Sequence, residues 1–245
     1  MGLITLAIDV GGTGIKAMLL QENGEAASWR SRIETPHPAS PDRLVPVLVE
    51  LALQMGECDR IAIGFPSVVE AGITRGAINL HPAWDGFPLA KVLQTKLGKP
   101  LCIANDADVQ GYGAIAGRGV ELTITLGTGF GSALFVDGRL LPNLELGQHL
   151  WQNNLTYEDW LGQSALEKMG IENWQQKLGE AIAALYKLFN FDHLYIGGGN
   201  ARLLGQDWVI KLPSVIASRL TIVSNDLGLL GGLALWRFQG NYPSH

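Results

Sequence analysis

The chain has 245 residues, of which 47% are hydrophobic and 17% are charged. This composition predicts a sizeable buried core, in one large domain or two lobes, and excludes a disordered chain. A formal net charge of −5 provides no basic footprint for nucleic acid. Cys58 and Cys102 are far apart and have no neighbours at metal-ligand spacing, so we expect neither a disulfide framework nor structural zinc.

The first apolar run follows no basic segment and is interrupted by Asp9, which does not fit a secretion signal. No apolar stretch of the sequence is long enough to span a membrane. We therefore expect a soluble, cytoplasmic protein with no membrane partner.

Strands and helices alternate through the first half of the chain. Asn23-Gly24 is a hairpin signal. Ser40-Pro41 predicts a helix start with Ser as the cap, and Gly98 predicts a helix end. Strands are predicted at 3–10, 15–20, 26–33, 60–65 and 101–104, and helices at 41–55, 88–97 and 106 to about 117.

The second half shows a similar alternation. Asp137-Gly138 turns one predicted strand into the next. Strands are predicted at 122–126, 132–136, 139–141 and 193–196, and helices at 156–169, 173–189 and 226–238.

Two glycine segments are copies of one pattern. Gly12-Thr13-Gly14 and Gly127-Thr128-Gly129 each follow a strand and precede a second strand and a tight turn. This predicts a duplicated α/β lobe with a cleft between the copies, rather than one continuous sheet. We place the N-terminal lobe at 1–109, with the last helix (226–240) packing back on it, and the C-terminal lobe at 110–225.

The first segment, from Asp9 to Lys16, has the chemistry of a phosphate-binding loop. Gly11 and Gly12 free backbone N–H groups to face an anion, and Thr13 adds a hydroxyl. Lys16 can neutralise phosphate charge, and Asp9 can position a hydrated Mg²⁺. The glycine spacing fits neither a Walker A loop nor a Rossmann fingerprint. An ordinary glycine-rich hairpin with an exposed lysine is the alternative.

Gly127-Thr128-Gly129 offers the same donors from the second lobe, although any tight hairpin tolerates such glycines. As a pair, the two loops predict a clamp on one phosphate chain. Gly197-Gly198-Gly199 follows a predicted strand. It predicts either packing against the base and ribose of a nucleotide or a close helix–strand contact.

Asn105-Asp106 stands between a short strand and a helix. Asp106 is either a helix cap or a general base that takes a proton from a hydroxyl nucleophile, with Asn105 holding a neighbouring hydroxyl. Glu145 and His149 place an acid and an imidazole just after the second meander of strands, and they are candidate ligands.

These residues, in this order, resemble the ROK family of sugar kinases and sugar-responsive repressors, most closely its polyphosphate/ATP glucokinase branch. The resemblance covers 6 to about 146 and 155 to about 235. Asp9-x-Gly-Gly-Thr-x-x-Lys16 resembles the first phosphate motif of the family. The stretch from Leu126 to Gly138 resembles the second.

The resemblance implies an actin-like ATPase (ribonuclease H-like) fold. It implies that Asp106 is the catalytic base and that Asn79, Asn105, Glu145 and Glu158 bind sugar. Phe65-Pro66 and the stretch 79–84 resemble the loops that close over the sugar. Gln148 departs from the pattern, because it occupies the place of the family histidine and His149 follows one residue later. The cysteine-rich zinc motif is missing, as in the polyphosphate branch.

The expected reaction is transfer of a phosphoryl group from ATP or polyphosphate, with Mg²⁺, to the 6-hydroxyl of glucose or a related hexose. We expect a homodimer whose partners are a sugar and a phosphoryl donor, with no nucleic acid. The alternatives are a non-catalytic sugar- or nucleotide-binding regulator and a kinase with a degenerate sugar site.

Overall fold

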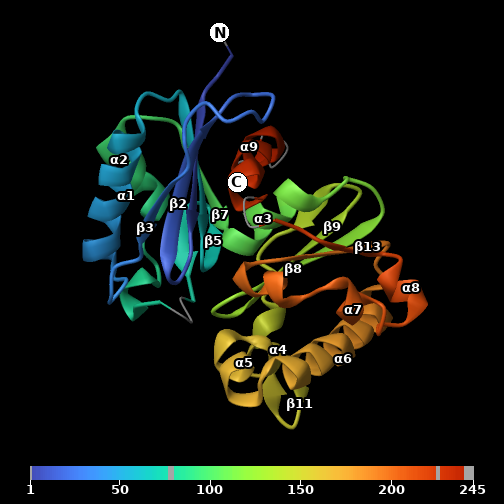
Figure 1. Cartoon of the computed structure of the whole chain (residues 1–245). Coiled ribbons are helices and arrows are strands. Elements are labelled where there is room, and N and C mark those ends of the chain that lie inside the picture. The colour runs from blue at the N-terminus through green and yellow to red at the C-terminus, as the bar shows by residue number, and fades with distance from the viewer. Residues whose placement is uncertain (1, 77–79, 225–226, 240–245) are drawn as a thin grey trace. The chain divides into compact units, whose positions relative to one another are not determined.

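The computed structural model describes residues 2–76, 80–224 and 227–239. The chain divides into two compact units (Figure 1). Unit 1 comprises Met1–Gly113 with Asp226–His245, and unit 2 comprises Ala114–Asn225. Among the described helices, none is both long and apolar enough to cross a membrane.

Unit 1 is built on a five-stranded sheet. Its strands are β1 (Thr5–Val10), β2 (Gly14–Leu20), β3 (Ser31–Glu34), β4 (Arg60–Phe65) and β7 (Leu101–Asn105). Their order is β3-β2-β1-β4-β7, with β1, β4 and β7 parallel and β2 antiparallel to both of its neighbours. The carboxyl ends of β1, β4 and β7 therefore share one edge of the sheet, the usual place for ligands in such sheets.

Helices cover both faces of this sheet (Figure 1). α1 (Pro41–Met55) and α2 (Leu89–Leu97) pack on one face over a core that includes Leu6, Ile8 and Leu48. The C-terminal helix α9 (Leu227–Gln239) packs against β1 and β4, and its Leu229 and Leu233 join Ala7 in a second core.

Glycines let α9 cross α3 (Asp106–Ala114) with backbone against backbone. A Cβ on Gly231 would lie 1.7 Å from the carbonyl oxygen of Val109, and one on Gly113 would lie 2.3 Å from that of Leu227. Since real Cβ atoms do not approach so closely, this crossing needs glycine at both positions.

Unit 2 repeats the topology of unit 1. Its sheet contains β8 (Val120–Leu126), β9 (Phe130–Val136), β10 (Arg139–Leu141), β13 (His193–Gly197) and β14 (Leu220–Ile222). The order β10-β9-β8-β13-β14 reproduces β3-β2-β1-β4-β7 with the same parallel and antiparallel pairings. This confirms the duplicated α/β fold predicted from the glycine segments.

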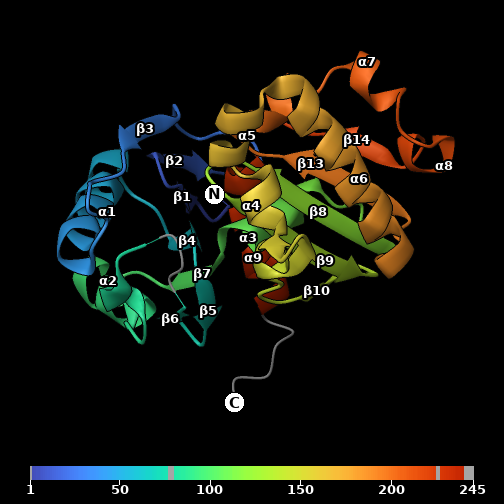
Figure 2. The same ribbon diagram turned by 90° about the horizontal axis from the view of Figure 1, so that it is seen from below.

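Three helices cover one face of the second sheet: α4 (Tyr157–Leu161), α5 (Gln163–Met169) and α6 (Ile171–Phe189) (Figure 2). The prediction of one helix at 156–169 was wrong, because the chain breaks at Gly162, where ψ is 172°. A Cβ on Gly162 would lie 3.0 Å from the carbonyl oxygen of Thr128. The break thus brings the start of α5 against the second glycine loop. Two short helices, α7 (Gln206–Val209) and α8 (Ser214–Ala217), follow later.

Most other differences concern boundaries and very short elements. Ser40 occupies the cap position of α1, but its hydroxyl makes no capping bond. α3 ends at Ala114 rather than near 117, because the N–H groups of Ala116 and Gly117 donate to the carboxylate of Glu121 instead. The elements missed are β5 (Val68–Glu70), β6 (Ile73–Arg75), β11 (Leu150–Gln152), β12 (Leu155–Thr156), β14, α7, α8 and 3-10 turns at Pro82–Trp84, Leu146–Gln148 and Gly199–Leu203. Elements this short carry too few residues for a periodic pattern.

Candidate functional site

The first glycine loop connects β1 to β2 and is held from behind by Thr35. The N–H of Gly11 donates to the carbonyl of Gly14 at 3.0 Å and closes the turn. The buried hydroxyl of Thr35 donates to the carbonyl of Gly11 at 2.6 Å, and its N–H donates to that of Thr13 at 3.5 Å. Gly12 and Thr13 are exposed. Two carbonyls are thus tied to the scaffold while the tip of the loop faces solvent.

Asp9 and Lys16 are opposite one another in the β1–β2 ladder and form an ion pair of 3.1 Å. Asp9 is only 8% exposed. A Cβ on Gly228, in the first turn of α9, would lie 3.0 Å from the carboxyl carbon of Asp9. The loop is therefore charged and crowded, and phosphate binding by it stays a prediction.

Asn105 and Asp106 lie at the carboxyl end of β7, on the same edge of the sheet as the first glycine loop. The Asn105 side-chain oxygen accepts from the N–H groups of Ala107 (2.8 Å) and Asp108 (3.3 Å). Its amide nitrogen donates to the carbonyl of Ser67 at 3.3 Å. Asn105 therefore caps α3, the role that was one of two alternatives for Asp106.

Asp106 follows as the first residue of α3 and remains partly exposed. One of its carboxylate oxygens accepts from the N–H of Ala107 at 2.9 Å. Gly64 in β4 allows α3 to approach, since a Cβ there would lie 3.3 Å from the Cα of Asp106. The carboxylate is thus fixed at the sheet edge by backbone contacts while part of it reaches solvent.

The second glycine loop connects β8 to β9 and is held from behind by Gln163 and Asn200. The N–H of Gly127 donates to the carbonyl of Gly129 at 3.2 Å. The N–H of Gln163 donates to the carbonyl of Thr128 at 3.2 Å. The amide of Asn200, a buried residue, donates to the carbonyl of Gly127 (3.4 Å) and to the Gln163 side chain (2.8 Å). As in unit 1, loop carbonyls are tied back by residues distant in sequence.

The triple glycine lies at the carboxyl end of β13, beside this loop. Gly198 has φ of +87°, and a Cβ there would lie 2.3 Å from the carbonyl oxygen of Leu126. A Cβ on Gly199 would meet nothing within 4 Å. A close backbone contact therefore explains Gly198. Nucleotide binding by Gly197, Gly198 and Gly199 stays a prediction.

Glu158 joins the second glycine loop to the segment around Gln148. One carboxylate oxygen accepts from the N–H of Phe130 at 3.1 Å, and the other accepts from the Gln148 amide at 3.3 Å. Burial, followed by the negative charge of Glu158, raises the pKa of Glu145. Glu145, Gln148 and Glu158 are therefore one cluster.

His149 faces a different neighbour. It is exposed, and its ring lies 6.3 Å from that of Tyr157, centroid to centroid. Tyr157 in turn stacks on Trp151 with ring centroids 5.1 Å apart and planes at 8°. The side chain that joins the carboxylate cluster is thus Gln148, and a sugar contact by His149 stays a prediction.

Asn79, the remaining predicted sugar ligand, lies outside the described residues. Trp84, at the other end of the predicted sugar loop, is fully buried, and its ring lies 4.7 Å from that of Phe65, centroid to centroid, with the planes tilted by 59°. Its indole N–H donates to the carbonyl of Ala39 at 2.6 Å. Trp84 therefore anchors the loop to the core.

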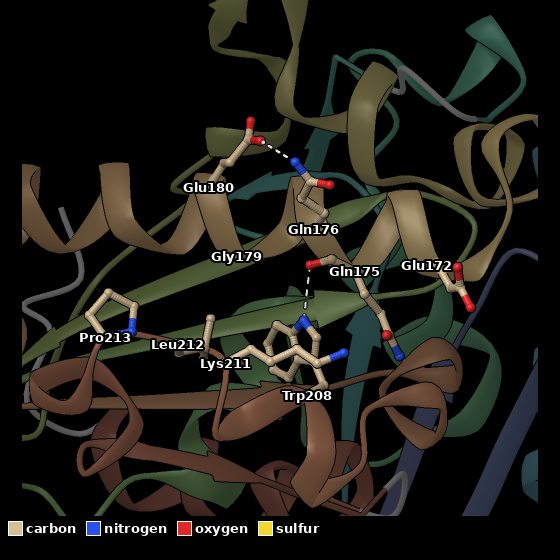
Figure 3. A pocket seen from close by; sticks show the side chains of 9 residues that line it. All are labelled: Glu172, Gln175, Gln176, Gly179, Glu180, Trp208, Lys211, Leu212 and Pro213. Atoms are coloured by element: carbon tan, nitrogen blue, oxygen red, sulfur yellow. Dashed lines mark hydrogen bonds between the residues drawn. The ribbon is translucent and has the colours of Figure 1, made fainter.

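A separate hollow of about 740 Å³ lies in unit 2 between α6 and the segment from Trp208 to Pro213 (Figure 3). The indole N–H of Trp208 donates to the carbonyl of Gln175 at 2.9 Å and closes one wall. Glu172 and Glu180 line the hollow with a single cation, Lys211. None of the predicted site residues that the structure describes lines this space.

Sequence reasoning missed four residues that hold the loops and the cluster: Thr35, Gln148, Gln163 and Asn200. Of these four, only Gln148 stood out in the sequence, because it departs from the family pattern. Within the described residues no group of three or more His, Cys, Asp or Glu side chains is placed to hold a metal ion. A single carboxylate such as Asp9 still fits Mg²⁺, which commonly keeps several waters and takes one or two carboxylates plus substrate phosphates.

The chain matches known proteins over most of its length. A family model described as ROK family matches residues 5–144. The chain is 30% identical over 234 residues to a polyphosphate glucokinase of Mycobacterium tuberculosis (strain CDC 1551 / Oshkosh), covering 91% of this chain and 88% of that protein.

Two solved structures share the architecture. The inorganic polyphosphate/ATP-glucomannokinase from Arthrobacter sp. strain KM has a TM-score of 0.86 and 27% identity, covering 97% of this chain and all of that one. The ROK family glucokinase from Streptomyces griseus, solved in complex with glucose and AMPPNP, has a TM-score of 0.76 and 19% identity, covering 95% and 98%. At 19% identity, the likeness to the Streptomyces griseus glucokinase is evidence for the fold alone. Together the two structures confirm the predicted actin-like ATPase fold.

Proposed function

Because the chain belongs to the ROK family, we propose that it is a hexose kinase that transfers a phosphoryl group from ATP or polyphosphate to the 6-hydroxyl of glucose or a close relative. The polyphosphate glucokinase and the glucomannokinase among its relatives support this substrate class. The observation that carries the proposal is the carboxylate of Asp106 at the carboxyl end of β7, fixed but partly exposed.

In the proposed reaction, Asp106 accepts the proton of the sugar hydroxyl as that oxygen attacks the terminal phosphorus of the donor. The bond from this phosphorus to its bridging oxygen breaks, and ADP or a polyphosphate shortened by one phosphate leaves. Asn105 orients Asp106 by capping α3. In unit 1 the first glycine loop, with Thr13 and Lys16, would bind donor phosphates, and in unit 2 the second glycine loop, with Thr128, would do the same. Asp9 would hold Mg²⁺ through water, and the ion would supply neutralisation of phosphate charge.

Unit 2 would supply the sugar ligands. Glu145 and Glu158 can each accept hydroxyl hydrogens, and the Gln148 amide both donates and accepts. The amide of Gln148 bonds to Glu158, and the charge of Glu158 acts on Glu145, which supports this assignment.

The test is a coupled assay that crosses a panel of hexoses with Mg²⁺·ATP and polyphosphate. We expect Asp106→Ala to lower turnover about 10²-fold or more, the usual contribution of a general base. Asp207→Ala, which removes an exposed aspartate from α7, is the matched control and should leave turnover unchanged. Near-normal turnover by Asp106→Ala would remove Asp106 from this role.

Gln148 supports a second candidate, a sugar-binding protein without turnover, because this residue stands where the family pattern has histidine. Calorimetry with glucose separates the possibilities. Binding without turnover would identify a regulator, whereas absence of binding would identify a kinase with a degenerate sugar site.

A further inference from the structure

The carboxylate of Glu158 contacts both ligand-binding regions assigned to unit 2. Glu158 lies in the first turn of α4. Its bond from the Phe130 N–H (3.1 Å) reaches the residue directly after the second glycine loop. Its bond from the Gln148 amide (3.3 Å) reaches the cluster proposed to bind sugar. One side chain therefore joins the phosphate loop to the sugar cluster.

The backbones around these bonds are closely packed. A Cβ on Gly147 would lie 2.3 Å from the carbonyl oxygen of Phe130 and 3.7 Å from a Glu158 carboxylate oxygen. The rings of Phe130 and Tyr157 stack with centroids 5.8 Å apart. The start of β9, the 3-10 turn Leu146–Gln148 and the start of α4 thus form one packed body.

From this geometry we infer that Glu158 is a positioning residue of the second phosphate loop, through which sugar binding strengthens donor binding. The inference rests on the proposed function. A negative charge beside a loop that must hold phosphates opposes donor binding. Sugar hydroxyls that donate to this carboxylate offset its charge while the Phe130 N–H keeps the loop in place.

The coupling has a measurable size. If bound sugar relieves the repulsion, the donor should bind about fivefold or more tightly in its presence, the lower end of common coupling between sites. Because such coupling is reciprocal, the donor should tighten sugar binding by the same factor.

The experiment measures dissociation constants of AMPPNP with Mg²⁺ and of tripolyphosphate, each with and without saturating glucose, by calorimetry. We expect Glu158→Gln to reduce the coupling factor of the wild type to near one, because the uncharged amide exerts no repulsion for sugar to relieve. Glu172→Gln makes the same chemical change at an exposed position of α6 and should retain the coupling. No coupling in the wild type, or unchanged coupling in Glu158→Gln, would overturn the inference.

A second measurement does not need any ligand. Amide hydrogen exchange of Phe130 should become about fivefold faster in Glu158→Gln, as expected for weakening one hydrogen bond by roughly 1 kcal/mol, and stay unchanged in Glu172→Gln. Unchanged exchange in Glu158→Gln would overturn the positioning role. If the wild type binds neither glucose nor either donor, the proposed function fails. The exchange rate of Phe130 then still tests whether Glu158 positions the second glycine loop.

Discussion

At the scale of single residues, the loops and the helix that carry the candidate groups are held by uncharged polar side chains. Thr35 and Asn200 each donate to a carbonyl of a glycine loop, and Asn105 caps the helix that carries Asp106. The sequence identifies Asp9 by its glycine loop, Asp106 by its place between a strand and a helix, and Glu145 by its nearness to His149. It does not identify Thr35 or Asn200, since threonine and asparagine are ordinary loop residues whose contacts appear only after folding.

The pKa of Glu145 gives a prediction at this scale. Burial and the charge of Glu158 raise it, so the folded protein binds the Glu145 proton more tightly than the unfolded chain does. This stabilisation is complete below the ordinary glutamate pKa and is lost as pH rises through the elevated pKa. The Glu145→Gln variant should therefore gain stability relative to the wild type on going from pH 4 to pH 7.

Urea denaturation at several pH values measures this difference. The effect should be modest, because the residue as a whole is exposed even though its carboxylate is partly desolvated, so solvent still screens the charge. A difference between Glu145→Gln and the wild type that stays constant from pH 4 to pH 7 would contradict the raised pKa.

At the scale of elements, sequence patterns predict the long pieces and miss the contacts that bend them. α1, β4 and the strands on either side of Asp137-Gly138 follow from apolar periodicity and turn chemistry, and Asp137 and Gly138 do adopt positive φ. The break between α4 and α5 does not follow, because Gly162 alone does not indicate whether a helix ends there. Its reason is the nearby Thr128 carbonyl, a contact across 34 positions of sequence.

The crossing of α3 and α9 gives a prediction at this scale. In an ordinary helix interior, replacing glycine by alanine stabilises by about 1 kcal/mol. Gly231→Ala should instead destabilise unit 1 by about 2 kcal/mol or more, since its Cβ would lie 1.7 Å from the Val109 carbonyl oxygen. Gly205→Ala is the control, because a Cβ there meets nothing within 4 Å, and it should stay within about 0.5 kcal/mol of the wild type. Urea denaturation measures both, and a stabilised Gly231→Ala would contradict the crossing.

At the scale of the whole molecule, the duplication explains why two distant glycine segments look alike. Each segment follows the central strand of its sheet, and the two sheets have the same strand order. In each turn a backbone N–H donates to a carbonyl two or three residues later, from Gly11 to Gly14 and from Gly127 to Gly129. The sequence predicts this repeat because the same Gly-Thr-Gly spacing follows a strand in both halves of the chain. It does not predict how each loop is held, since Thr35 in unit 1 and Gln163 with Asn200 in unit 2 occupy unrelated positions in the chain.

The equivalence of the two loops leads to a prediction about the donor. Thr35→Val and Asn200→Leu each remove the side-chain donor to a loop carbonyl, at 2.6 Å and 3.4 Å, while keeping similar size. One lost hydrogen bond corresponds to about 0.5–1.5 kcal/mol, so each variant should raise the donor KM by roughly twofold to tenfold. The sugar KM should change less, because both side chains hold loops proposed to bind phosphate. Thr35→Ser, which keeps the hydroxyl, should retain the wild-type donor KM. Steady-state kinetics with ATP and polyphosphate measure these values, and a change confined to the sugar KM would show that the loops do not hold the donor.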